Sequence, residues 1–413
     1  MNTPPPVADV PLADINVADP TLYRDNLILP YFERLRREDP VHLHPAHHHE
    51  NGAFWSVTKY ADIMAIETNP QVFSSARGPM IVDPPEDLPL PMFIGMDPPK
   101  HTQERKAVSP SVSPSNLKAY EVIIRSRMQA TLDALPIGEP FNWVERVSVD
   151  LTNQMLATLF DFPWEDRHLL TIWSDVGAAD PTSPIFKTND PHEEKKAILG
   201  ECLTYFNRLW NERVNAEPRG DLVSMLAHSP STRNMTQDEY LGNILLLIIG
   251  GNDTTRNSMS ASVLLMSENP SERAKLDSNP DLLPSMVSET IRWQTPLAHM
   301  RRNTLEDVEL GGKLIRKGEK VIMWYVSGNR DEDVFERASE YLIDRPKVRQ
   351  HLSFGFGIHR CMGNRLAELQ LRILWEEILE RFPTIDVVSP PERVLSSFVR
   401  GYERVEVVIP RRL

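Results

Sequence analysis

Residues 354–363 read Phe-Gly-Phe-Gly-Ile-His-Arg-Cys-Met-Gly, and this stretch surrounds one cysteine, Cys361, with three glycines, a histidine and an arginine. The amphipathic pattern from Asn364 to Trp375 predicts a helix directly after it. Free N–H groups and the positive end of the helix dipole favour the thiolate form of a cysteine placed there. The stretch therefore predicts an anionic sulfur on a loop in front of a helix.

Such a thiolate is the kind of soft ligand that binds haem iron axially. Gly357 and Gly363 lack a Cβ, so the loop can turn tightly and a flat macrocycle can lie close to its backbone. The alternative is a buried, inert cysteine at a helix start. The glycines, the histidine and the arginine together favour haem ligation by Cys361.

The composition limits the function classes. The chain has 413 residues and a net charge of -13, which argues against nucleic acid as the main partner. Two cysteines, Cys202 and Cys361, fit a reducing cytoplasm rather than a disulfide framework. No signal peptide is visible, and the apolar run from Ile244 to Ile249 is too short for a transmembrane segment.

The periodicity predicts a mainly α fold with a small β region, in one continuous domain over residues 1–413. Strand signals are confined to residues 41–57, with a turn at Asn51-Gly52, and to residues 304–325. In the second region Gly311-Gly312 predicts a hairpin. Prolines separate the helical patterns, and residues 1–12 are expected to be disordered.

A long helix is predicted from the capping box Thr236-Gln-Asp-Glu239 to about Glu268. Its middle contains Gly250-Gly-Asn-Asp-Thr-Thr255, and each glycine costs a helix about 1 kcal/mol relative to alanine. Close helix packing is one explanation. The other is a groove for a ligand, in which Asp253 and Thr254 relay protons. The acid beside the alcohol favours the groove.

Several side chains are candidates to bind the propionates of a haem. Asp97 is predicted to cap a helix that begins at Pro98, which places His101 and Arg105 one turn apart on one face. Both can donate to a carboxylate. An arginine at 301–302 and His359, two residues before the cysteine, can do the same. Solvated side chains are the alternative at each position.

These motifs resemble the cytochrome P450 family along the whole chain, and they occur in family order. The resemblance implies that Cys361 is the proximal iron ligand. It also implies roles for other residues: haem binding by His101, Arg105, Arg302, Phe354, His359 and Gly363; oxygen activation around Gly250, Gly251, Asp253 and Thr254; and a structural ion-pair triad of Glu289, Arg292 and Arg345.

Within the family the chain is most similar to the soluble bacterial enzymes that hydroxylate the ends of alkanes and fatty acids. The resemblance implies haem b as cofactor and a monooxygenase that inserts one oxygen atom of O2 into a C–H bond. Residues 77–94 would close over the substrate, and residues 177–189 would form a lid. The expected substrate contacts are Ile249, Leu297, Met300, Phe398 and Val399.

Electrons would come from a separate ferredoxin and its reductase, because no dinucleotide-binding fingerprint is present. A basic surface for ferredoxin is expected from Lys100, Arg105, Lys106, Arg360, Arg365 and Arg372. Three alternatives remain: a terpenoid or steroid hydroxylase of the same family, a peroxygenase, and a haem-thiolate sensor without turnover. The intact Asp253-Thr254 pair argues against the peroxygenase.

Overall fold

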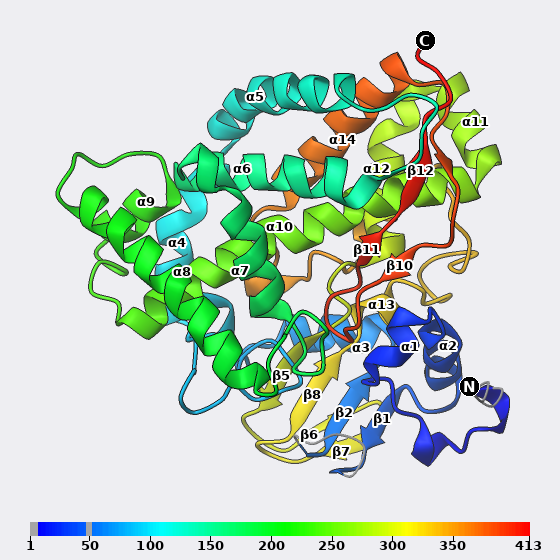
Figure 1. Ribbon diagram of the computed structural model, residues 1–413. Coiled ribbons are helices and arrows are strands. Elements are labelled where there is room, and N and C mark those ends of the chain that lie inside the picture. The colour runs from blue at the N-terminus through cyan, green and yellow to red at the C-terminus, as the bar shows by residue number, and fades with distance from the viewer. Residues whose placement is uncertain (1–6, 47–51) are drawn as a thin grey trace.

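Helices dominate the computed structural model, which describes residues 7–46 and 52–413 (Figure 1). The α-helices are α1 Pro20–Arg24, α2 Ile28–Glu38, α3 Tyr60–Glu67, α4 Lys100–Val108, α5 Pro114–Asp133, α6 Asp150–Phe160, α7 His168–Ala178, α8 Pro191–Val214, α9 Leu222–His228, α10 Gln237–Glu268, α11 Pro270–Ser278, α12 Leu283–Gln294, α13 Tyr325–Gly328 and α14 Asn364–Arg381. The predicted mainly α fold class is confirmed.

The predicted β region forms one five-stranded sheet, in the order β1-β2-β8-β5-β3. Its strands are β1 Val41–His44, β2 Phe54–Val57, β3 Phe73–Ser74, β5 Met300–Thr304 and β8 Lys320–Met323. β2 and β8 run parallel, whereas the other neighbours are antiparallel. The predicted hairpin is present as β6 Val308–Leu310 and β7 Lys313–Ile315. Asn51, in the other predicted turn, lies outside the described residues.

Further strands lie outside the two predicted regions, so the expectation that strands are confined to those regions is wrong. They are β4 Phe141–Asn142, β9 Asp386–Val387, β10 Glu392–Arg393, β11 Tyr402–Arg404 and β12 Glu406–Val408. The β3 and β5 strands of the main sheet were also missed, since β5 reaches the predicted region only at Thr304. All of the missed strands except β5 have only two or three residues, which is too short to show an alternating pattern.

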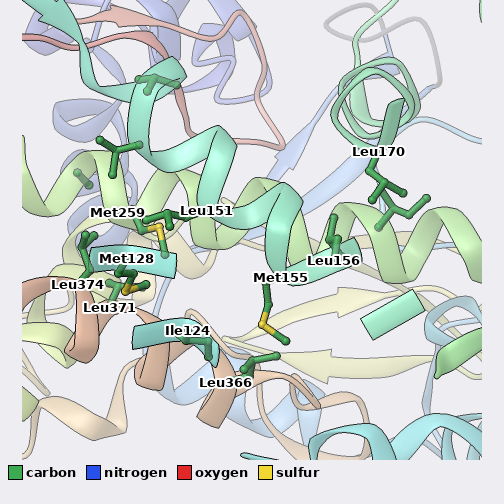
Figure 2. Close-up of a cluster of buried hydrophobic side chains, with 14 of the residues drawn as sticks. Ile124, Met128, Leu151, Met155, Leu156, Leu170, Met259, Leu366, Leu371 and Leu374 are labelled. Atoms are coloured by element: carbon green, nitrogen blue, oxygen red, sulfur yellow. The ribbon is translucent and has the colours of Figure 1, made fainter. Parts of the chain in front are cut away.

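The long helix α10 crosses the centre of the helical part of the molecule (Figure 1). It begins with the predicted capping box, in which Thr236 and Glu239 bond each other's backbone N–H groups. α5, α6, α7 and α14 pack around it in one apolar core. Figure 2 shows this core, with Met259 of α10 among side chains such as Leu151, Met128 and Leu371. The central helix is therefore held from several sides.

Two predictions in the N-terminal quarter of the chain are wrong, one for residues 7–12 and one for Asp97. Residues 1–12 were expected to be disordered, and residues 1–6 lie outside the described residues, but Val7–Asp9 forms a 3-10 helix and Arg34 donates to the carbonyl groups of Val7 and Val10. Asp97 does not cap α4, which begins at Lys100. Its carboxylate instead accepts hydrogen bonds from the Ser74 hydroxyl and the Ser75 N–H, at 2.5 and 2.8 Å.

Candidate active site

A cavity of about 1050 Å³ lies between α10, the cysteine loop and the segment 76–95. It falls at the upper end of the size range of small-molecule sites. The predicted site residues that line it are Arg105, Ile249, Gly250, Gly251, Thr254, Leu297, Met300, Arg302, Phe354, His359, Cys361, Gly363 and Phe398. The fold thus brings together residues more than 250 positions apart in the sequence.

Cys361 faces this cavity from the loop before α14. Its backbone N–H donates to the carbonyl of Phe354 at 2.7 Å, which fixes the loop. Gly357 is required there, because its φ is +66° and a Cβ would lie 2.2 Å from the Glu67 carbonyl oxygen. A Cβ on Gly363 would meet nothing nearer than the Cys361 sulfur at 4.0 Å.

Burial raises the pKa of the Cys361 thiol, whereas the N–H groups of Gly363 and Asn364 and the guanidinium groups of Arg105 and Arg360 act in the opposite direction. The helix start therefore stabilises the thiolate as expected, but desolvation by the surrounding protein outweighs it, although Cys361 is exposed toward the open cavity. A metal cation at the sulfur would supply the missing stabilisation, because a coordinated thiol is deprotonated. The donor chemistry of this loop fits an iron ligand.

Unpaired donors mark one end of the cavity. The rings of His101 and His359 lie 4.1 Å apart, and neither nitrogen of His101 has a hydrogen-bond partner among the described residues. Burial and the neighbouring arginines lower the pKa of His101 to about 4 and of His359 to about 2. His101 itself is buried just behind the cavity wall. A bound anion would satisfy these donors, and the haem propionates fit that requirement.

The structure separates the two candidate arginines of β5. Arg302 lines the cavity and pairs with buried Glu67 at 2.8 Å. Arg301 is not part of the lining, and its guanidinium binds Asp83 and Asn303. Arg302 is therefore the one placed to contact a cofactor in the cavity. Haem binding by Arg302 stays a prediction.

The two glycines of α10 differ in their surroundings. A Cβ on Gly250 would meet nothing within 4 Å, so this position opens onto the cavity. A Cβ on Gly251 would lie 2.7 Å from the Leu156 Cδ2 atom of α6. Each of the two explanations predicted from the sequence therefore applies to one glycine. Gly250 opens a groove, and Gly251 allows close helix packing. The Thr254 hydroxyl donates to the Gly250 carbonyl at 2.8 Å and borders this groove.

Asp253 does not face the cavity, so the expectation that acid and alcohol stand together at the void is wrong for the acid. Its carboxylate is buried and pairs with Arg256 at 2.7 Å. Arg256 also pairs with Asp175 of α7 at 2.8 Å, and the Asp175 side chain is 32% exposed. Burial, helped by Asp175, raises the pKa of Asp253 to about 6, against the opposing effect of Arg256.

The three residues of the ion-pair triad are buried together. Glu289 binds Arg292 at 2.7 Å and Arg345 at 3.0 Å. The Arg292 guanidinium also donates to the carbonyls of Asn329 and Ala338. These bonds join α12 to the segment 329–345, which leads into the cysteine loop.

The predicted apolar wall is present with one exception. Ile249, Leu297, Met300 and Phe398 line the cavity, whereas Val399 packs in the same cluster but is absent from the lining. Val399 instead forms a β-bridge with Leu297. Most residues of the predicted cover 77–94 line the cavity, and so do residues 177–182 and Phe186 of the predicted lid 177–189. Their roles as cover and lid stay predictions. Sequence reasoning missed Lys195, Leu245 and Gln370, which carry no local signal.

Comparisons with known proteins extend over nearly the whole chain. The profile described as Cytochrome P450 matches residues 93–401. Cytochrome P450-153 from Novosphingobium aromaticivorans is 44% identical with a TM-score of 0.88, and the match covers 95% of this chain and 98% of that one. Linalool 8-monooxygenase of Pseudomonas putida is 35% identical, with 95% and 98% covered. Methyl-branched lipid omega-hydroxylase of Mycobacterium tuberculosis is 30% identical, with 98% and 96% covered.

None of the helices in residues 7–46 and 52–413 is long and apolar enough to cross a membrane.

Proposed function

The chain belongs to the cytochrome P450 family and is a haem-thiolate monooxygenase, and we propose that it hydroxylates the chain end of an alkane or a fatty acid. One observation supports the proposal above all others. Cys361 and the Gly250–Thr254 groove line the same, largely apolar cavity from two different elements. A substrate bound in this cavity would therefore lie close to both Cys361 and the Gly250–Thr254 groove.

Cys361, His101, Arg105, Arg302 and His359 are the residues that would hold haem b. When bound, haem supplies the activation of O2 and the transfer of one oxygen atom to carbon. The chain would supply a thiolate ligand at Cys361, and cations or ring N–H groups for the propionates. Phe354 and Gly363 line the cavity next to the sulfur, where a flat ring can lie.

Protons reach the site from the α10 side. Thr254 holds a proton on Oγ1 at the cavity wall, where it now donates to the Gly250 carbonyl. Asp253 is the adjacent acid, and its pKa of about 6 suits proton exchange near neutral pH. Asp175 connects this acid to the surface through Arg256. We therefore assign Asp253 to proton supply behind the wall, and Thr254 to proton transfer at it.

The chain-end preference is supported by the walls and by a relative. Ile249, Leu297, Met300 and Phe398 give the cavity an apolar wall near the groove. Terminal C–H bonds are stronger than internal ones, so selection of the chain end must come from the shape of the cavity. The methyl-branched lipid omega-hydroxylase is named for oxidation at a chain end, and its alignment covers 98% of this chain at 30% identity.

We also propose that a ferredoxin and its reductase deliver the electrons to this cytoplasmic enzyme. Among the predicted basic residues, Lys100 pairs with Glu239, Arg372 pairs with Glu121 and Glu376, and Arg105 lines the cavity. Arg360 and Arg365 remain exposed and join Arg349 around a hollow of about 230 Å³ behind the cysteine loop. These arginines suit an acidic ferredoxin.

The iron ligand is tested by comparing the two cysteines. Cys361→Ala should abolish the red-shifted absorption band of the ferrous–CO complex, because that band needs a thiolate ligand. Cys202→Ala is the matched control, since Cys202 is buried in the core and is not part of the cavity lining. A Cys361→Ala protein with an unchanged band would overturn the assignment.

The substrate class is tested by titration of the purified haem protein. Dodecane and dodecanoic acid should shift the iron to high spin, whereas sterols should not. A terpenoid substrate is the second candidate, favoured by the 35% identity to linalool 8-monooxygenase. Linalool turnover faster than dodecane turnover would support that candidate. Absence of any product with ferredoxin and reductase would favour a sensor.

A further inference from the structure

A lysine without a carboxylate partner lies in the wall of the cavity. Lys195, in the second turn of α8, is half-buried, and its ammonium donates to the carbonyls of Gly177 and Ala179 at 3.0 and 3.5 Å. No carboxylate of the described residues lies within ion-pairing distance of it. Burial lowers the pKa of Lys195 to about 8. A half-buried ammonium bound only to neutral carbonyls lacks an anion that would compensate for its partial desolvation.

The other charges of this part of the cavity are already paired. His192 also lines the cavity, but its ring binds Asp87 at 3.0 Å, and Lys196 binds the same carboxylate at 2.8 Å. Asp180 accepts hydrogen bonds from Thr182 and acts on Lys195 only at longer range. Among the described residues of α7 and α8 that line the cavity, Lys195 is thus a cation that remains available to an anionic ligand. Arg77, on the segment that covers the cavity, is a second lining cation without an ion pair among the described residues.

The backbone that Lys195 binds packs against apolar side chains of α10 that line the cavity and precede the groove. The carbonyl that Lys195 binds belongs to Gly177, and a Cβ on Gly177 would lie 3.1 Å from Ile249 and 3.7 Å from Leu245. Ile249 precedes Gly250, where the groove opens. A ligand with its charge at Lys195 would therefore run along Leu245 and Ile249 before its far end meets the groove.

We propose that Lys195 binds the carboxylate of a fatty-acid substrate and so directs the opposite, methyl end of the chain toward Thr254. This inference rests on the proposed function and decides between its two substrate classes in favour of the acid. An alkane of the same length would contact the same apolar side chains but leave the ammonium unpaired. A charge-assisted bond in a dry site is about twice as strong as a neutral one.

The test compares ligands that differ only at one end. Dodecanoate, 1-dodecanol and dodecane are titrated into the haem-loaded wild type, Lys195→Gln, Lys195→Arg and Lys187→Gln, with Kd read from the Soret shift. Glutamine keeps a donor for the Gly177 carbonyl but removes the charge. Lys187 is the matched control because it lies in the same region and also donates to a carbonyl, that of Pro184, but is exposed and outside the lining.

Dodecanoate should bind about tenfold more weakly to Lys195→Gln, the effect of one charge-assisted bond. Binding of 1-dodecanol and dodecane should not change, Lys195→Arg should retain the acid, and Lys187→Gln should match the wild type. With Lys195→Gln, hydroxylation of dodecanoate should also spread from the terminal carbon to internal ones. An unchanged Kd for dodecanoate, or an equal loss for the alcohol, would overturn the inference.

A pH series of the wild type provides a second measurement, should Lys195→Gln fail to load haem. Between pH 7 and 9 Lys195 loses its proton, while carboxylic acids stay ionised. The Kd of dodecanoate should therefore rise about tenfold, in proportion to the lost ammonium, and that of 1-dodecanol should stay constant. Lys195→Arg keeps its charge over this range, so its acid profile reports the effect of the other charged groups nearby, Asp180, His192 and Asp87, and should stay nearly flat. A flat acid profile of the wild type contradicts the role of Lys195.

Failure of the inference and failure of the proposed function are distinguishable. If dodecane and 1-dodecanol bind and are oxidised at the chain end while Lys195→Gln behaves as the wild type, only the assignment of Lys195 is wrong. If the wild type binds none of the three ligands, both the inference and the chain-end function are wrong.

Discussion

At the scale of single residues, Asp253 and Thr254 show how neighbours can serve one process from different places. Thr254 borders the cavity, whereas Asp253 points to Arg256 and, through it, to Asp175. Protons held by the acid must therefore pass the helix wall to act in the cavity. The two residues should fail in different ways when they are replaced.

Thr254→Ala removes the hydroxyl at the cavity wall, so haem and substrate binding should persist while reduced oxygen leaves as peroxide.

Asp253→Asn removes the proton reservoir but leaves the cavity wall intact, so turnover should fall about 10²-fold or more with a raised solvent isotope effect. Product and peroxide per NADH, and kcat in H2O and D2O, are the measurements.

Asp238→Asn is the matched control, since Asp238 is exposed in the first turn of the same helix. It should leave both ratios unchanged. Normal coupling in Thr254→Ala would remove the proton-transfer role, and a normal rate in Asp253→Asn would remove the supply role.

The sequence predicted which residues form the site, but it predicted the orientation of their side chains less well. Cys361, Thr254 and His359 face the cavity because short motifs fix their backbone. Asp97 was placed wrongly because its partners, Ser74 and Ser75, approach from another segment and compete with the helix for its carboxylate. The side-chain orientation of a residue depends on such distant partners, which local patterns do not contain.

At the scale of elements, α10 combines close packing and an opening in adjacent glycines. Gly251 lies against Leu156 of α6, and Gly250 faces the cavity. The helix therefore accepts two unfavourable residues for two different reasons. This difference can be measured with the same substitution at each position.

Gly250→Ala should stabilise α10 by up to about 1 kcal/mol, because alanine is the better helix former and its methyl group enters open space. Its cost should be functional, since the narrower groove weakens the Soret response to substrate. Gly251→Ala should destabilise the protein relative to Gly250→Ala by about 1 to 3 kcal/mol through overlap with Leu156. Urea unfolding and substrate titration of both variants measure the two effects, and equal behaviour would refute the distinction.

Long elements were predictable, and short ones were not. The capping box located the start of α10, and the Gly311-Gly312 pair located the β6–β7 hairpin. The two-residue strands β3, β4, β9 and β10 exist because a partner strand lies beside them. Their residues have no periodicity, so pairing across the fold is what defines them.

At the scale of the whole molecule, the cavity is built from segments that no sequence pattern connects. α8, α10, α14 and the segment 76–95 each contribute lining residues. Lys195 belongs to this group, because only the packing of α8 on α7 places its ammonium in the wall. The family resemblance predicted the residues around the sulfur. The lining residues of α8, such as Lys195, could be identified only from the three-dimensional structure.

The triad of Glu289, Arg292 and Arg345 fixes the relation between α12 and the segment that carries the cysteine loop. All three side chains are buried, so one carboxylate compensates two guanidinium groups in a dry interior. Glu289→Gln leaves both cations uncompensated and should lower the free energy of unfolding by about 3 to 5 kcal/mol. Urea titration followed by far-UV circular dichroism, together with the fraction of haem retained, measures this loss.

Glu340→Gln is the matched control for that change. The Glu340 side chain is exposed and pairs with Arg337 on the surface, although its backbone carbonyl contacts Arg292 and Arg345. Solvent screens such an exposed pair, so this variant should unfold almost as the wild type does and keep its haem. Equal stability of the two glutamine variants would show that Glu289 does not hold α12 and the segment 329–345 together. The position of the cysteine loop would then depend on its own backbone hydrogen bonds.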